Sequence, residues 1–190
     1  MARDAPAAGS PGEICPVLIG AKIPVVVVTR VDGTVTDLGA VTAGRPTVLV
    51  FCLGGWSPRC KLFLQQLQEL RAHLGELGYQ VVAVSPDRPG HLGETASELG
   101  LEYNLLSDSM MSAARALGIA YRVDESALER YRREGVDLEE RSGEPHHMLP
   151  VPAMFVVGSD GVIRFEYVNP DEQVRPTPEM VLAAAKMTVG

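Results

Sequence analysis

Hydrophobic positions in the first half of the chain repeat with two different periods. Residues 45–53, "RPTVLVFCL", form a short continuous apolar run, which is typical of a strand buried on both faces. The segment after it carries large apolar side chains at steps of four and three, which indicates one helix face ending before Gly78. A second apolar run at 79–87 then predicts a parallel strand pair joined by a right-handed crossover. The predicted helix face consists of Phe63, Leu67, Leu70, Leu74 and Leu77.

The remaining pattern adds hairpins and short helices. Apolar runs on either side of Asp32-Gly33 and of Asp160-Gly161 predict two hairpins. Short helices are predicted at 91–99 and at 109–117, the second with Asp108 or Ser109 as its cap, and a last helix begins after Thr177. This order of elements predicts an α/β fold with a mixed sheet flanked by helices on both faces.

The length of 190 residues suits one domain. Residues 1–20 are rich in Ala, Gly and Pro and are expected to form a flexible lead-in to a domain at 21–190. Residues 121–147 are highly charged and predict a helical insertion over the surface.

Composition excludes several classes of function. The formal net charge of −7 offers no positive surface for nucleic acid or an anionic membrane. No apolar run approaches the roughly 20 residues that span a bilayer, and the first twenty residues do not resemble a secretory signal. The three cysteines do not form a disulfide framework, so we expect a cytoplasmic protein.

The candidate chemistry lies where the first buried strand meets its helix, at "GGWSPRC", residues 54–60. A cysteine at such a junction has its thiolate stabilised by the free N–H groups and positive dipole end of the helix. Ser57 occupies that position here, and a serine has neither an ionised form near neutral pH nor a sulfenic acid. Ser57 followed by Pro58 is, however, a favourable helix start, and we interpret Ser57 first as an N-cap.

"VLVFCLGGWSPRCKLFLQQL" resembles the active-site segment of the peroxiredoxin-like (AhpC/TSA, redoxin) branch of the thioredoxin superfamily. "LPVPAMFVVGSDGVIRFEYVNPD" resembles the Pro-containing loop and hairpin of the same branch. The resemblance implies a thioredoxin fold, with Ser57 at the place of the nucleophilic cysteine and Cys60 at that of the second, resolving cysteine. It also implies a cis bond before Pro152, in a loop with Val151 that faces the active site.

The departures from the family pattern are clustered around the motif. Gly54 stands at the threonine position of standard peroxiredoxins, and Cys52, Arg59 and Lys61 also differ from the residues common in the family. Several changed neighbours favour natural divergence over a single engineered Cys→Ser substitution, although the second alternative stays open.

For each of the other candidate site residues, a structural role is weighed against a functional one. Cys60 is expected to be a small buried residue inside the helix, and a Cys52–Cys60 disulfide is an alternative that spacing alone does not decide. Trp56 is expected to pack beside the site, and Arg59 either binds an anionic substrate or faces water. His147, with His146, could approach the pocket through the proline loop, but adjacent histidines are a poor metal pair. We expect neither metal nor cofactor.

Three functions are compatible with this sequence. The favoured one is a peroxiredoxin-like protein repurposed as a small-molecule enzyme that uses the old pocket. The alternatives are a thiol-dependent peroxidase or oxidoreductase, with Cys60 active or Ser57 engineered, and a non-catalytic binding module. Because serine cannot form a sulfenic acid, we expect the chain to be a poor peroxidase. A small-molecule substrate and a possible homodimer are expected; fold alone does not choose among these functions.

Overall fold

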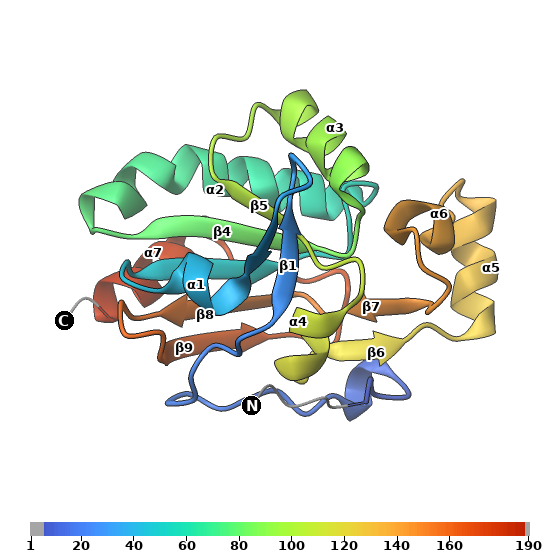
Figure 1. The fold of residues 1–190 in the computed structure, drawn as a ribbon, viewed down its shortest axis with the longest axis horizontal. Helices are drawn as coiled ribbons and strands as arrows, with labels where there is room; N and C mark the ends of the chain where they lie inside the picture. The colour runs from blue at the N-terminus through green and yellow to red at the C-terminus, as the bar shows by residue number, and fades with distance from the viewer. Residues whose placement is uncertain (1–5, 189–190) are drawn as a thin grey trace.

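The computed structural model describes residues 6–188, and its centre is a seven-stranded mixed sheet (Figure 1). The strands β3, β4 and β5 pair in parallel, and every other neighbouring pair is antiparallel. In spatial order the strands are β2 (Val35–Asp37), β1 (Val27–Arg30), β5 (Asn104–Ser107), β4 (Gln80–Ser85), β3 (Thr47–Phe51), β8 (Ala153–Val157) and β9 (Ile163–Val168). The predicted mixed sheet and both predicted hairpins are therefore confirmed.

Helices lie on both sides of this sheet. The helices α2 (Pro58–Glu76) and α3 (Pro89–Leu99) lie on one side in Figure 1, and α7 (Pro178–Met187) packs against α2. The short helices α4 (Ser112–Ala116) and α1 (Leu38–Thr42) contact the hairpin of β1 and β2. This arrangement is the thioredoxin-like fold that the sequence predicted.

The strand β3 and the helix α2 place the candidate site. Every residue of β3 is buried, because parallel strands in the middle of a sheet are covered on both faces. The helix α2 begins after Ser57, whose side chain accepts a hydrogen bond from the Cys60 N–H, with Pro58 at the first helical position. It ends before Gly78, which has a φ of 87° and is thereby suited to glycine.

The predicted helix at 109–117 is shorter in the structure. The N-cap position is held by Met111 and not by Asp108 or Ser109 as expected, but the carboxylate of Asp108 still accepts hydrogen bonds from the N–H groups of Ala113 and Ala114 in the first turn, at 3.0 and 2.9 Å. The helix itself starts only at Ser112, because Met111 has a left-handed backbone with a φ of 56°.

The charged insertion forms two helices beyond one end of the sheet, on the right in Figure 1. These are α5 (Glu125–Arg133) and α6 (Leu138–Ser142), each capped by an aspartate side chain. Two short strands, β6 (Ala120–Arg122) and β7 (Met148–Pro150), pair at its base. The helical character was predicted, whereas these strands and β5 were not.

The N-terminal lead-in runs beside that base. In its described part, Ala8 exchanges backbone hydrogen bonds with Ala120 and Arg122, and the η1 turn (Pro11–Glu13) contacts β6. Its flexibility stays a prediction.

The bond before Pro152 is trans, since the described residues contain no cis peptide, and the expected cis-proline is therefore wrong. Trans is the favoured form even before proline. Here it lets the chain pass from β7 to β8 while the Val151 N–H donates to the Ile119 carbonyl and the Pro152 carbonyl accepts from Asn169.

Candidate functional site

Two glycines form the turn between β3 and α2, and neither has room for a side chain. Gly54 has a φ of 148°, and a Cβ on it would lie 2.2 Å from Nε1 of Trp56. A Cβ on Gly55 would lie 1.9 Å from the Thr95 hydroxyl oxygen. The threonine of standard peroxiredoxins therefore cannot be accommodated at position 54 while Trp56 stays in place.

A buried aspartate fixes this turn. Asp87 is fully buried, and its carboxylate accepts from the Gly55 N–H at 2.6 Å and from the Ser85 hydroxyl at 3.2 Å. Its other oxygen accepts from Nε of Arg141 in α6 at 2.9 Å. One ion pair, between Arg141 and Asp87, therefore connects the insertion to the Gly-Gly turn. Sequence analysis missed Asp87 because an aspartate after a strand has no distinctive pattern.

Ser57 acts as the helix cap, as predicted. Its Oγ lies 3.4 Å from the Cys60 N–H, and the residue is only 9% exposed. The hydroxyl also helps to lower the pKa of the Cys60 thiol. Ser57 therefore acts on both the backbone N–H and the thiol of the cysteine in its own helix.

Several donors converge on the sulfur of Cys60, which is fully buried. The Leu53 N–H lies 3.3 Å from Sγ, and Nη2 of Arg175 lies 3.2 Å from it. The buried thiol of Cys52 donates to the Val84 carbonyl at 3.5 Å and also interacts with the Cys60 sulfur, which shifts the pKa of both thiols. The hydroxyl of Ser57 acts on the same sulfur.

These donors favour a negative charge on one sulfur and a proton on the other. The hydrogen bond from Cys52 lowers the pKa of Cys60 most, burial opposes it, and the Arg175 guanidinium helps, so that the pKa falls to about 5. The same hydrogen bond, together with burial, raises the pKa of Cys52 well above its ordinary value. The pair is therefore best described as a Cys60 thiolate beside a Cys52 thiol.

Arg175 was not found by sequence analysis. It lies in the loop between β9 and α7, 115 residues from Cys60. Its Nη1 donates to the carbonyls of Glu172 and Val174, each at 2.9 Å. Among the described residues its Nε is one of the buried polar atoms without a hydrogen-bond partner. No local motif marks this arginine, because only the folded loop brings it to the sulfur.

A pocket of about 440 Å³ lies at the N-terminus of α2. Trp56 and Arg59, predicted to flank the site, both line it, and the Trp56 ring packs edge-on against Tyr131 at 5.1 Å between centroids. The opposite wall comes from α5 and the 172–173 loop. Its lining residues are Leu53, Trp56, Ser57, Pro58, Arg59, Arg130, Tyr131, Glu134, Glu172 and Gln173.

Other predicted site residues lie away from this pocket. Val151 and Pro152 are buried and do not line it, because the insertion supplies the wall that the proline loop was expected to supply. His147 is paired with the carboxylate of Glu139 at 2.6 Å and does not line the pocket either. Cys52 is buried and does not line the pocket. Within residues 6–188 no group of three potential metal ligands occurs.

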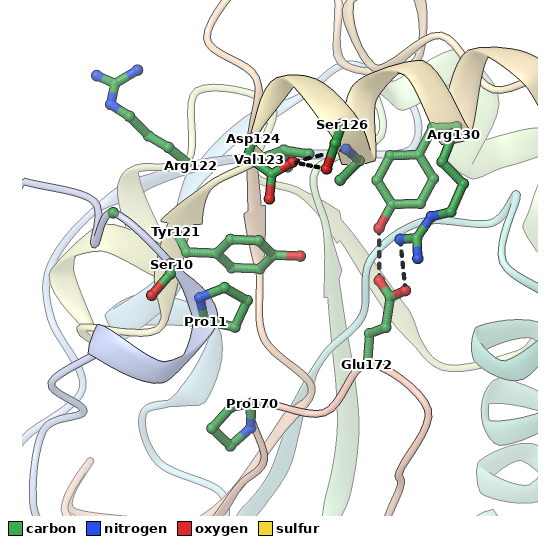
Figure 2. A pocket seen from close by; sticks show the side chains of 13 residues that line it. Ser10, Pro11, Tyr121, Arg122, Val123, Asp124, Ser126, Arg130, Pro170 and Glu172 are labelled. Atoms are coloured by element: carbon green, nitrogen blue, oxygen red, sulfur yellow. Dashed lines mark hydrogen bonds and ion pairs between the residues drawn. The ribbon is translucent and has the colours of Figure 1, made fainter.

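A second cavity of about 330 Å³ lies on the other side of Glu172 (Figure 2). The phenol of Tyr131 donates to the Glu172 carboxylate at 2.6 Å, and Nη2 of Arg130 lies 2.9 Å from its other oxygen. These three residues line both cavities and so form the partition between them.

The order of strands in the sheet and the helix that follows β3 define a thioredoxin-like fold. The model of the AhpC/TSA family matches residues 19–166, and the chain belongs to that family. Among the described residues, no helix has the length and apolar character to cross a membrane.

Solved structures agree on the fold. Reduced Prx3 from Vibrio vulnificus superposes with a TM-score of 0.72 at 16% identity, over 90% of this chain and 99% of that one. AhpC from Enterococcus faecalis gives 0.68 at 23% identity, over 90% and 92% of the two chains. Peroxidoxin BcpB from Mycobacterium tuberculosis gives 0.69 at 17% identity, over 90% and 98%. Among curated proteins, none matches this sequence.

Proposed function

We propose that this protein is a thiol-dependent oxidoreductase in which Cys60, rather than the residue at position 57, is the reacting sulfur. The observation that supports this most is the set of groups around Cys60: Arg175 and the Leu53 N–H donate to one buried sulfur, and Cys52 and Ser57 also lower the pKa of its thiol. A structural cysteine packs as a small apolar residue and does not need a guanidinium. The favoured sequence interpretation, a non-redox enzyme, therefore becomes the second candidate.

The proposed substrate is a small hydroperoxide, with a dithiol as reductant. The Cys60 thiolate attacks the terminal oxygen, so that an S–O bond forms and the O–O bond breaks. The departing oxygen takes a proton from solvent and leaves as an alcohol or water. Cys52 then attacks the Cys60 sulfenic acid, a disulfide forms and water leaves. The external dithiol reduces this disulfide and is itself oxidised.

Access is from the pocket at the start of α2. Leu53 and Ser57 contact the Cys60 sulfur from one side and line the pocket with the other. Cys60 itself is fully buried and does not line the pocket, so the proposal requires the residues that cover the sulfur to move when a substrate binds. The Nε–H of Arg175 is buried and has no hydrogen-bond partner among the described residues, so a substrate oxygen that reached the sulfur would meet a free donor there.

Hydroperoxide consumption with dithiothreitol tests the proposal. With dithiothreitol the wild-type protein should consume hydroperoxide and Cys60→Ser should not. Without dithiothreitol, one equivalent of hydroperoxide should leave the wild type with a Cys52–Cys60 disulfide and leave Cys52→Ser with a Cys60 sulfenic acid, because no resolving thiol remains. The matched control is Cys15→Ser, since Cys15 is exposed and distant in sequence from the pair. Equal rates for the wild type and Cys60→Ser would overturn the proposal.

The second candidate is the repurposed small-molecule enzyme. The observation in its favour is the pocket itself, which carries Arg59, Arg130 and Glu134 around the Ser57 hydroxyl, whereas Cys60 does not line it. Its activity would survive Cys60→Ser and be lost in Arg59→Met, the reverse of the expectation for the thiol enzyme. The homodimer stays a prediction.

A further inference from the structure

We propose that Glu172 is a positioning residue, held by α5 of the charged insertion, that keeps Arg175 against the sulfur of Cys60. The inference rests on the proposed function, in which Cys60 is the reacting sulfur. It gives a role in the site to an insertion whose sequence predicted only a solvated helical face.

The carboxylate of Glu172 is bound from one side by α5. Figure 2 shows Arg130 extending from the helix to Glu172, where dashed lines mark the two interactions with the carboxylate. Tyr131 donates its phenol hydrogen to one oxygen at 2.6 Å, and burial and this bond raise the pKa of that phenol. Because hydrogen bonds to charged groups are stronger than neutral ones, two such bonds fix the side chain of Glu172.

The backbone of Glu172 continues the connection toward the sulfur. Its carbonyl accepts from Nη1 of Arg175 at 2.9 Å, and Nη2 of the same guanidinium lies 3.2 Å from Cys60. The guanidinium is planar and rigid, so fixing one nitrogen fixes the direction of the other. Movement of the Glu172 backbone would therefore change the Arg175–Cys60 distance.

The rest of the loop offers mainly local support. Asp171 and Gln173 are exposed, and their backbone N–H groups bond to side chains two residues earlier, on Asn169 and Asp171. Such turns stabilise the shape of the loop without attaching it to the insertion. The carboxylate of Glu172 makes that attachment, across 41 residues of sequence to Tyr131.

The thiolate absorbance near 240 nm, titrated from pH 4 to 8, measures the effect directly. The parent is Cys15→Ser, which leaves only the two buried thiols. The charged and titratable groups that act on these sulfurs, Cys52, Asp87 and Arg175, are unchanged in every test variant. The readout does not depend on turnover and is insensitive to a purely structural role.

Glu172→Ala should raise the titration midpoint of Cys60 by about 1 pH unit, because Arg175 loses its fixed position. Glu172→Gln keeps one acceptor and should raise the midpoint less, and Tyr131→Phe, which keeps the ring against Trp56, should also raise it less. The matched control Glu125→Gln, on the exposed start of α5, should leave it at the parent value.

The outcomes separate this inference from the proposed function. A parent protein whose Cys60 titrates as an ordinary thiol would overturn both. A low parent midpoint that stays unchanged in Glu172→Ala and in Tyr131→Phe would overturn the positioning role and leave Cys60 as the reacting sulfur. A low parent midpoint that rises most in Glu172→Ala and less in Glu172→Gln and Tyr131→Phe, with Glu125→Gln unchanged, would support both the positioning role and the proposed function.

Discussion

Replacement of Arg175 by methionine tests the electrostatics of the site most directly. Methionine keeps an unbranched side chain but removes the guanidinium whose Nη2 lies 3.2 Å from the Cys60 sulfur. The hydrogen bond from Leu53 remains, as do the effects of Cys52 and Ser57 on the pKa of Cys60. The variant therefore isolates the positive charge from the other donors.

The expected size of the effect follows from that one contact. A hydrogen bond to a charged group contributes about 1.5–3 kcal/mol, and one pKa unit corresponds to about 1.4 kcal/mol, so the pKa of Cys60 should rise by about 1–2 units. From a starting value of about 5, the thiolate fraction at pH 6 should then fall about two- to tenfold.

Two assays measure this change in the Cys15→Ser protein. Thiolate absorbance gives the midpoint, and stopped-flow consumption of hydroperoxide at pH 6 gives the rate, which should fall with the thiolate fraction. Arg133→Met, an exposed arginine of α5 that bonds only to a backbone carbonyl of its own helix, is the matched control. An Arg175→Met midpoint equal to that of the parent would refute the assignment of Arg175 as the stabilising charge.

Three further predictions concern the same site. The pKa of Cys60 is lower in the folded protein than in the unfolded chain, so its contribution to stability is complete above about pH 9 and is lost as the pH falls toward 5. Urea unfolding should therefore show the stability difference between the parent and Cys60→Ser shrinking by at most about 1.4 kcal/mol per pH unit from pH 8 to pH 5. The comparison of the two proteins is needed because the buried Asp108, whose pKa is raised to about 7, adds a slope of opposite sign to both. Gly54→Thr should displace the Trp56 indole and quench or shift its fluorescence, because a Cβ there would lie 2.2 Å from Nε1; an unchanged emission spectrum would contradict this. Asp87→Asn should destabilise the fold by about 3–5 kcal/mol in chemical denaturation, since it leaves the charge of Arg141 without its buried partner; a loss below about 1 kcal/mol would show that the pair contributes little.

The sequence predicted the elements whose signals are local. Periodicity located α2, and Ser57, Pro58 and Gly78 marked its ends, because capping depends on residues within one helical turn. The two Asp-Gly turns likewise identified their hairpins. The strand β5 was missed because it has only four residues and lies between two short helices.

The functional environment of Cys60 could not be predicted in the same way. Arg175, Glu172 and Asp87 act across 115, 41 and 32 residues of sequence in their key contacts, and nothing local distinguishes them from surface residues. The proline loop was expected to form a wall of the pocket, by resemblance to the family. The insertion takes that place, since α5 contributes Tyr131 at the pocket.

Serine at position 57 has a chemical consequence beyond the loss of a sulfur. Its hydroxyl accepts from the Cys60 N–H and also helps to lower the pKa of the Cys60 thiol, so it acts on the helix and on the sulfur at once. A cysteine there would be a weak acceptor and a weak donor, and its own thiolate would compete with Cys60 for the same negative charge. In the proposed function, Ser57 therefore favours a single thiolate, on Cys60, one turn inside the helix. The thiol of Cys52 beside it keeps its proton. Two of the departures from the family pattern then fit the proposed function together. Cys52 supplies the second thiol, and Gly54 leaves room for Trp56 beside the pocket.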